Sequence, residues 1–296
     1  MKDLAYFKLE KVKHSNETEI TESEFESLLR LEDFLNEQGV RTTKKRFRLS
    51  EASQHWLRGL VSVGFTVKNS RVSAIKISRF NLTDLPEILY EFSELEYLDL
   101  SENKIRQIPE SIIKLTKLKT LILRSNDLID LPEAFFSLIS LKKLDVTHNP
   151  LLQLSESIGK LSNLKSFHFG TFDATKIPKS LGNVTALKTL SLTFSTSEVI
   201  PETIGNLVNL ERLSLSAKEI TSLPETFRNL KKVEFLYLYT VNTTNLPEVL
   251  LDLPSLFNLI LEGEICKIAI QGHELDERTE YIGETLQRRG VIFTVP

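Results

Sequence analysis

The sequence predicts an α/β solenoid, with short parallel strands forming a curved sheet on the concave side and short helical segments on the convex side. Two observations predict this fold class. Apolar residues recur at a constant 23-residue interval through most of the chain, and a proline followed by glutamate recurs in the second half of the interval. A single repeat of this length cannot bury its own apolar residues, so the repeats must stack into one continuous core.

The first half of each repeat has the spacing of a short buried strand. Apolar residues follow the first repeat position by three and five residues, as Leu121 and Leu123 follow Leu118. Side chains alternate along a strand, so both leucines face the same side and we expect that side to be the core. The register comprises nine positions without an insertion: Val72, Leu95, Leu118, Leu141, Leu164, Leu187, Leu210, Val233 and Leu256.

The second half of each repeat carries a helix-start signal. Proline at the first helical position, followed by an acidic residue, favours a short helix. Lys179 replaces the glutamate in one repeat, and Ser155 replaces the proline in another. The prolines are Pro86, Pro109, Pro132, Pro178, Pro201, Pro224 and Pro247.

Before the repeats, the sequence predicts a docked helix followed by a hairpin. Thr21 and Glu24 have the spacing of a capping box, and the helix should end at Gly39. Residues Gly64–Ile77 alternate apolar and polar around the turn Asn69-Ser70, which predicts a β-hairpin that covers the edge of the first repeat. Residues 1–63 are therefore expected to form an N-terminal helical extension, and residues 64–263 the repeat array with its hairpin cap.

After the array, residues 264–296 are expected to form a C-terminal cap. Helical spacing runs from Glu274 to Arg289, and Gly290 stands in the terminating position. Residues Val291–Val295 then have the pattern of a short strand. Solenoids need such caps to protect their terminal repeats.

The repeat pattern changes along the array. Asparagine occupies its position in three successive repeats, and asparagine there can bond the loop backbone. Other residues replace it downstream, which indicates either a loop reshaped as part of a binding site or drift tolerated by the loops. In order, the position holds Asn103, Asn126, Asn149, Phe172, Ser195, Lys218, Val241 and Glu264.

The residues that flank the inward leucines should line the concave face. Aromatic side chains at an exposed surface resemble interface hot spots, so we predict that this face binds a protein. The alternative is that the C-terminal helix folds over the aromatic strand and buries it. The predicted protein-binding residues are Phe235, Tyr237, Tyr239, Phe194, His168 and Arg124.

Catalytic and cofactor chemistry is not predicted. Asp145, His168 and Ser191 fall on consecutive strands in the order of a triad, but no oxyanion site accompanies them, so a solvated polar face is the favoured interpretation. We find no phosphate-binding glycine motif and no metal-ligand spacing among the histidines, and we expect no cofactor and no metal. The basic segment Arg41–Arg48 is either a solvated connector or a patch for an acidic partner.

Composition narrows the class of protein further. With 41% hydrophobic residues and a formal net charge of -3, the chain can bury a core and has no basic field that would suggest nucleic acid as a partner. The start of the sequence lacks the apolar core of a signal peptide, and no apolar run approaches the ~20 residues of a membrane helix. One cysteine, Cys266, excludes an internal disulfide framework. We therefore expect a cytoplasmic protein that does not associate with membranes.

The segment Leu95–Leu115, LEYLDLSENKIRQIPESIIKL, resembles the 23-residue intracellular class of leucine-rich-repeat proteins, which includes Ras-group and Scribble-like scaffolds. The hairpin and the ending LQRRGVIF are similar to those of cytosolic prokaryotic members. The resemblance implies a non-enzymatic protein-binding module, and no particular partner transfers with it. We expect a monomeric scaffold that binds a protein partner on its concave face, with a small GTPase or another signalling protein as the candidate partner. The alternative function is a regulatory module that binds a small anionic or nucleotide-linked ligand.

Overall fold

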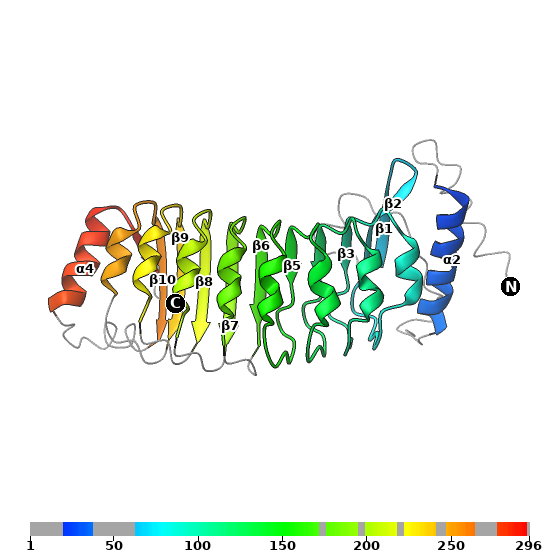
Figure 1. The fold of residues 1–296 in the computed structure, drawn as a ribbon, viewed down its shortest axis with the longest axis horizontal. Helices are drawn as coiled ribbons and strands as arrows, with labels where there is room; N and C mark the ends of the chain where they lie inside the picture. The colour runs from blue at the N-terminus through cyan, green and yellow to red at the C-terminus, as the bar shows by residue number, and fades with distance from the viewer. Residues whose placement is uncertain are drawn as a thin grey trace. The chain divides into compact units, whose positions relative to one another are not determined.

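The computed structural model describes residues 20–37, 63–171, 176–194, 199–217, 222–240, 247–263 and 277–294. The chain forms two compact units, an N-terminal unit, Met1–Leu144, and a C-terminal unit, Asp145–Pro296. Within each unit the strands follow one another in chain order in a sheet, and short 3-10 helices lie on one side of it (Figure 1). This arrangement confirms the predicted leucine-rich-repeat solenoid.

The N-terminal unit begins with helix α2 (Glu22–Glu37), close to the predicted bounds. Its apolar side chains Phe25, Leu28, Leu31 and Leu35 are buried, and the helix packs against the 3-10 helix η2 (Glu87–Glu91) of the first repeat. Ser27 and Arg30 of α2 both contact the carboxylate of Glu91. The helix is thus docked, as its broad apolar arc predicted.

The predicted capping box between Thr21 and Glu24 does not form. The Thr21 N–H donates to the Ser70 carbonyl at 3.1 Å instead. The buried Glu24 carboxylate accepts from the Val72 N–H at 2.7 Å and pairs with Arg71 at 3.0 Å. Glu24 therefore joins the helix to the hairpin, a contact between distant segments that local spacing could not reveal.

The hairpin and the first repeats follow the predicted register. Strands β1 (Val63–Lys68) and β2 (Arg71–Ile77) pair antiparallel, and both turn residues, Asn69 and Ser70, have positive φ values of 52° and 60°. These values are typical of a type I′ hairpin turn. Strands β3 (Tyr97–Asp99) and β4 (Thr120–Ile122) then add in parallel, with partners 23 residues apart.

The C-terminal unit continues this pattern with longer strands. Parallel pairing joins each strand from β6 to β10 to the next, again with partners 23 residues apart. Strand β5 (Lys143–Asp145) spans the division between the units. The strands are β6 (Ser166–Gly170), β7 (Thr189–Phe194), β8 (Arg212–Ala217), β9 (Phe235–Thr240) and β10 (Asn258–Gly263).

The C-terminal cap has the predicted helix and strand. Helix α4 (Glu277–Arg288) contacts the 3-10 helix η9 (Glu248–Asp252), and β11 (Ile292–Thr294) pairs in parallel with β10. Gly290 has a positive φ of 83°, and the Val291 N–H donates to the Leu286 carbonyl at 3.1 Å. This is the Schellman ending that the glycine predicted. Helix α4 therefore continues the row of helices of the unit, and β11 adds one more strand to its sheet.

The helical segments are 3-10 helices, and proline caps them rather than filling their first position. The proline carbonyl accepts the first i→i+3 bond, as Pro109 does from Ile112 at 3.0 Å. Ser155, which interrupts the proline series, caps its helix through a side chain that accepts from the Ser157 N–H. Besides η2, the helices are η3 (Glu110–Lys114), η4 (Glu133–Ser137), η5 (Glu156–Lys160), η6 (Lys179–Asn183), η7 (Glu202–Asn206), η8 (Glu225–Asn229) and η9 (Glu248–Asp252).

Several predictions concern residues outside the described ranges. They include the basic segment Arg41–Arg48, the cysteine Cys266 and the positions that replace asparagine downstream. Those positions are Phe172, Ser195, Lys218, Val241 and Glu264.

Candidate functional site

The strand side of the C-terminal unit carries the aromatic residues that the sequence singled out. Phe235, Tyr237 and Tyr239 occupy alternate positions of β9 and are each half-buried, whereas Leu236 and Leu238 between them lie in the core. Alternation along the strand therefore places all three aromatic side chains on the face opposite the core. We call the outward residues of β7 to β10 the strand face.

Small hydroxyl side chains lie on one side of the aromatics, on the adjacent strand β8 and on β7 beyond it. Ser214 and Ser216 of β8 pair directly with Tyr237 and Tyr239. Small neighbours leave the rings partly accessible, so the face offers apolar contact beside hydrogen-bonding groups. The hydroxyl residues of the strand face, all half-buried, are Thr189, Ser191, Thr193, Ser214 and Ser216.

Helix α4 does not account for the burial of these aromatics. It contacts η9, and Arg278 binds Glu248 of η9, while Arg289 donates to the carbonyls of Leu251 and Leu253. These contacts lie on the helix side of the last described repeat. Among the described residues, the helix therefore leaves the face of β9 uncovered.

Phe194 lies in the core. It is 3% exposed, and its ring packs against that of Phe169 with centroids 5.3 Å apart. Strand β7 runs on as far as Phe194, and alternation from Leu190 and Leu192 turns this side chain inward. Its ring therefore does not contribute to the strand face.

His168 and Arg124 lie apart from the aromatics along the chain. His168 is half-buried on β6, where its Nε2 lies 3.0 Å from Ser166 Oγ. Arg124 belongs to the N-terminal unit, follows β4 and is exposed. The structure thus brings three of the six predicted residues together on one strand.

Asp145 and His168 each bond to a hydroxyl residue two positions away in the chain. Asp145 Oδ1 accepts from the Thr147 N–H at 3.1 Å and from its hydroxyl at 2.7 Å. His168 pairs with Ser191 in the strand register, yet its Nε2 contacts Ser166. A triad needs the histidine to take the serine proton, so this arrangement gives no support to nucleophilic catalysis.

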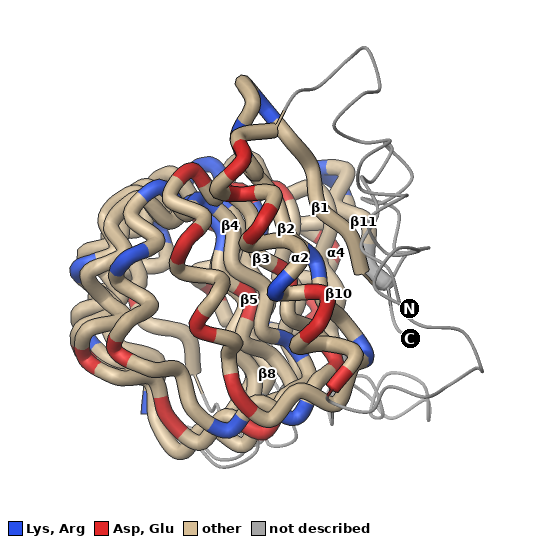
Figure 2. The backbone as a smooth tube through the Cα atoms, turned by 90° about the vertical axis from the view of Figure 1, so that its right-hand side faces the viewer, with Lys and Arg blue, Asp and Glu red and all other residues tan. Residues whose placement is uncertain are grey.

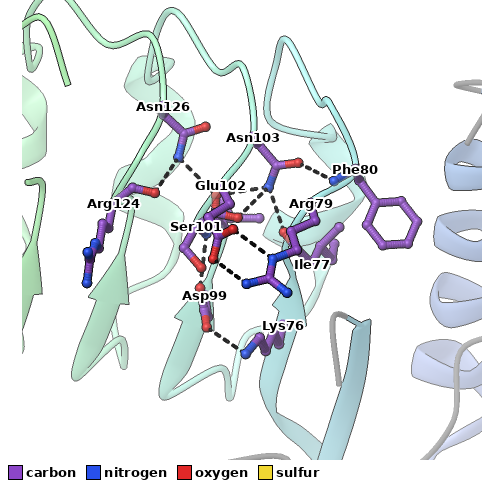
Figure 3. A network of polar contacts seen from close by, with 11 residues as sticks. Lys76, Ile77, Arg79, Phe80, Asp99, Ser101, Glu102, Asn103, Arg124 and Asn126 are labelled. Carbon is purple, nitrogen blue, oxygen red and sulfur yellow. Dashed lines mark hydrogen bonds and ion pairs between the residues drawn. The ribbon is translucent and has the colours of Figure 1, made fainter. Parts of the chain in front are cut away.

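The N-terminal unit holds a charged network instead (Figure 3). Lys76 and Asp99 pair at 3.4 Å with side chains only 12% and 6% exposed, and Arg79 pairs with Glu102 at 2.7 Å. The hydrogen bond from Arg79 lowers the pKa of Glu102 below its ordinary value. Burial, helped by the charge of Asp99, raises the pKa of Tyr97. In this network Lys76 is paired with Asp99, and Arg79 is paired with Glu102.

Asparagines hold the loops of this unit together. Asn103 Oδ1 accepts from the N–H groups of Phe80 and Leu82 at 2.9 and 3.2 Å, and its Nδ2 donates to the carbonyls of Ile77 and Leu100 at 2.7 and 2.9 Å (Figure 3). Asn126 repeats the pattern one repeat later. The role predicted for the asparagine position is confirmed.

Lysine and glutamate pair along the edges of both units. Lys119 binds Glu96 at 2.7 Å in the N-terminal unit, and Lys188 binds Glu211 at 2.6 Å in the C-terminal unit. Figure 2 shows Lys and Arg interspersed with Asp and Glu along the described backbone. The described residues contain no group of three or more His, Cys, Asp or Glu side chains arranged to hold a metal ion.

The comparisons with known proteins agree with the fold. The family model described as Leucine rich repeat matches residues 70–128. No curated protein matches the chain in sequence. The family match over residues 70–128, the 23-residue register of the paired strands and the similar solved structures all agree with a leucine-rich-repeat fold.

Three solved structures illustrate the similarity. A leucine-rich-repeat protein of Leptospira interrogans is 27% identical with a TM-score of 0.55, over 72% of this chain and 58% of that one. The ectodomain of the Arabidopsis thaliana membrane receptor kinase GASSHO1/SCHENGEN3, in complex with Casparian strip integrity factor 2, is 29% identical with a TM-score of 0.57, over 64% of this chain and 25% of that one. Internalin C2 of Listeria monocytogenes, at 22% identity and a TM-score of 0.54, covers 64% of this chain and 80% of its own and supports the fold alone.

The chain spans less than two thirds of the length of the first two of these structures.

Among the described helices, none has the length and apolar character needed to cross a bilayer.

Proposed function

We propose that this protein is a non-enzymatic interaction module that binds a protein partner on the strand face of its C-terminal unit, the concave side expected of the solenoid. The observation that carries the proposal is the half-exposed row Phe235, Tyr237 and Tyr239 on β9, flanked by hydroxyl side chains. Aromatic residues dominate protein interfaces because they bury a large area at a small cost in side-chain entropy.

Two similar structures support a protein or peptide as the ligand class. The plant receptor ectodomain described above was solved in complex with Casparian strip integrity factor 2. A second structure, PEPR1 with AtPEP1, is 26% identical with a TM-score of 0.54 over 67% of this chain and 33% of that one.

The test is affinity capture from lysate with the full chain, followed by mass spectrometry. Tyr237→Ala combined with Tyr239→Ala should reduce the specifically captured protein by at least about tenfold, since one interface hot spot is worth roughly 2 kcal/mol or more. Tyr281→Ala is the matched control, because Tyr281 is 61% exposed on α4, outside the strand face.

Equal capture by the double variant and the wild type would refute the proposal. A parallel loss of thermal stability in the double variant would point to a packing role instead.

The resemblance to Ras-group and Scribble-like repeats makes a small GTPase or another signalling protein the partner to seek in the captured fraction. We also propose that the protein is a cytoplasmic monomer. Saturable binding of a small anion without any specific protein would favour the regulatory alternative.

A further inference from the structure

Three residues of different chemistry lie in one row across the strand face. Strand pairing aligns Arg212 of β8 with Phe235 of β9, and Phe235 with Asn258 of β10. All three occupy the first outward position of their strand, so their side chains lie on the same face. The row therefore offers a cation on β8, an aromatic ring on β9 and an amide on β10.

Arg212 is exposed, and among the described residues it makes no ion pair. The acid next to it in the chain, Glu211, is bound by Lys188 at 2.6 Å. A guanidinium next to an aromatic ring on a partly desolvated face binds carboxylates more strongly than an isolated surface lysine does. The position therefore suits an anionic group of a ligand.

Asn258 presents the complementary polar feature. Its Oδ1 is buried and has no donor within the described part of the chain. A buried acceptor without a donor is costly, and such groups are rare in folded proteins. Because the oxygen is buried, the amide of Asn258 must rotate before the N–H or O–H of a ligand can reach and satisfy it.

We propose that the row Arg212, Phe235 and Asn258 recognises an extended acidic peptide segment, with a side-chain carboxylate on Arg212, an apolar side chain on Phe235 and a hydrogen-bond donor on Asn258. This inference rests on the proposed function and names the kind of partner. Neighbouring strands are about 4.8 Å apart, so the row spans roughly 10 Å, the length of about three residues of extended chain. The carboxylate and the donor should thus be separated by two to three residues in the bound segment.

The test is selection of a phage-displayed random 12-residue peptide library against the immobilised full chain. Wild type should enrich sequences in which Asp or Glu stands next to an apolar residue. Arg212→Glu should abolish this enrichment and weaken binding of the selected, fluorescently labelled synthetic peptide by about 10- to 100-fold, the factor for a charge-assisted hydrogen bond. Arg106→Glu, which changes an exposed arginine of the N-terminal unit, is the matched control and should bind like wild type.

Asn258→Ala separates recognition from folding. It removes an acceptor that has no donor in the described chain, so it should weaken peptide binding and leave the urea midpoint unchanged. The selected peptides could show no acidic preference, keep their binding in Arg212→Glu and lose it in Tyr237→Ala with Tyr239→Ala. That result would overturn this inference and leave the proposed function standing. Enrichment of no peptide would overturn this inference, while the proposed function would still be decided by capture of a protein partner from lysate. Equal competition by free glutamate would show an adventitious anion contact and would also overturn the inference.

Discussion

Asn103→Ala should be the most damaging single polar substitution in the described part of the N-terminal unit. The residue is 8% exposed, and its amide contacts five backbone groups that belong to two successive repeats. Alanine would remove both the acceptor and the donor at once. The substitution therefore tests whether the asparagine holds neighbouring loops together.

The magnitude follows from the groups left without a partner. The Leu100 carbonyl keeps a hydrogen bond from Asn126 at 3.0 Å, whereas the buried N–H groups of Phe80 and Leu82 lose the Asn103 oxygen. Each orphaned buried group costs about 1–3 kcal/mol, so we expect a loss of about 2–6 kcal/mol, with the lower values if water enters. Asn126→Ala should cost about 1–3 kcal/mol, because its oxygen holds one N–H, that of Ile105.

Urea unfolding followed by circular dichroism measures these losses. The control is Asn206→Ala, because Asn206 is exposed on η7 and should change stability by no more than about 0.5 kcal/mol. Asn103→Asp should be at least as harmful as alanine, since a carboxylate would face the carbonyls of Ile77 and Leu100. A loss for Asn103→Ala no larger than that for the control would refute the reasoning.

Two further predictions concern the C-terminal unit and acid. A Cβ on Gly182 would lie 2.3 Å from the Thr203 carbonyl oxygen, so Gly182→Ala should cost about 1–3 kcal/mol in urea unfolding, and Gly170→Ala, whose nearest contact is a side-chain atom at 3.3 Å, should cost less. The pKa of Glu156 is lowered, chiefly by the Ser180 hydroxyl. Because the pKa of Glu156 is lower in the folded state, its ionised form stabilises the fold above the ordinary pKa of 4.5, and this stability is lost as pH falls through the folded pKa. The melting temperature should therefore drop below pH 4.5. In Ser180→Ala this drop should be less steep. An unchanged acid slope in that variant would contradict this assignment.

The sequence predicted the repeats well because their cause is periodic burial. Leu118, Leu121 and Leu123 can reach the core in only one register, and a 23-residue period then positions every strand against the next. The hairpin turn and the Gly290 helix ending were equally predictable, because both depend on local backbone preferences. What local reasoning missed depends on partners distant in sequence, as with the bond from Val72 to Glu24.

The candidate site was predicted less completely. Tyr237 follows from alternation, but the inward turn of Phe194 required knowing where β7 ends. Arg212 and Asn258 shared a column with Phe235, and that shared column was the signal available in the sequence. The bonding state of Asn258 Oδ1 depends on the surrounding packing, which no spacing rule supplies.

The strands are longer in the repeats that lack the asparagine, and the aromatic residues of the strand face lie on one of these longer strands. Where asparagine is present, the residue before it takes a left-handed conformation, as at Glu102 and Ser125 with φ of 56°, and strands β3 and β4 have three residues each. Downstream, β7 to β10 have six residues each. The longer strand places Tyr239 inside the sheet, paired with Ser216, whereas the corresponding Arg124 follows β4. The departure from the repeat pattern is thus accompanied by a third outward position on each strand, and on β9 that position holds an aromatic ring.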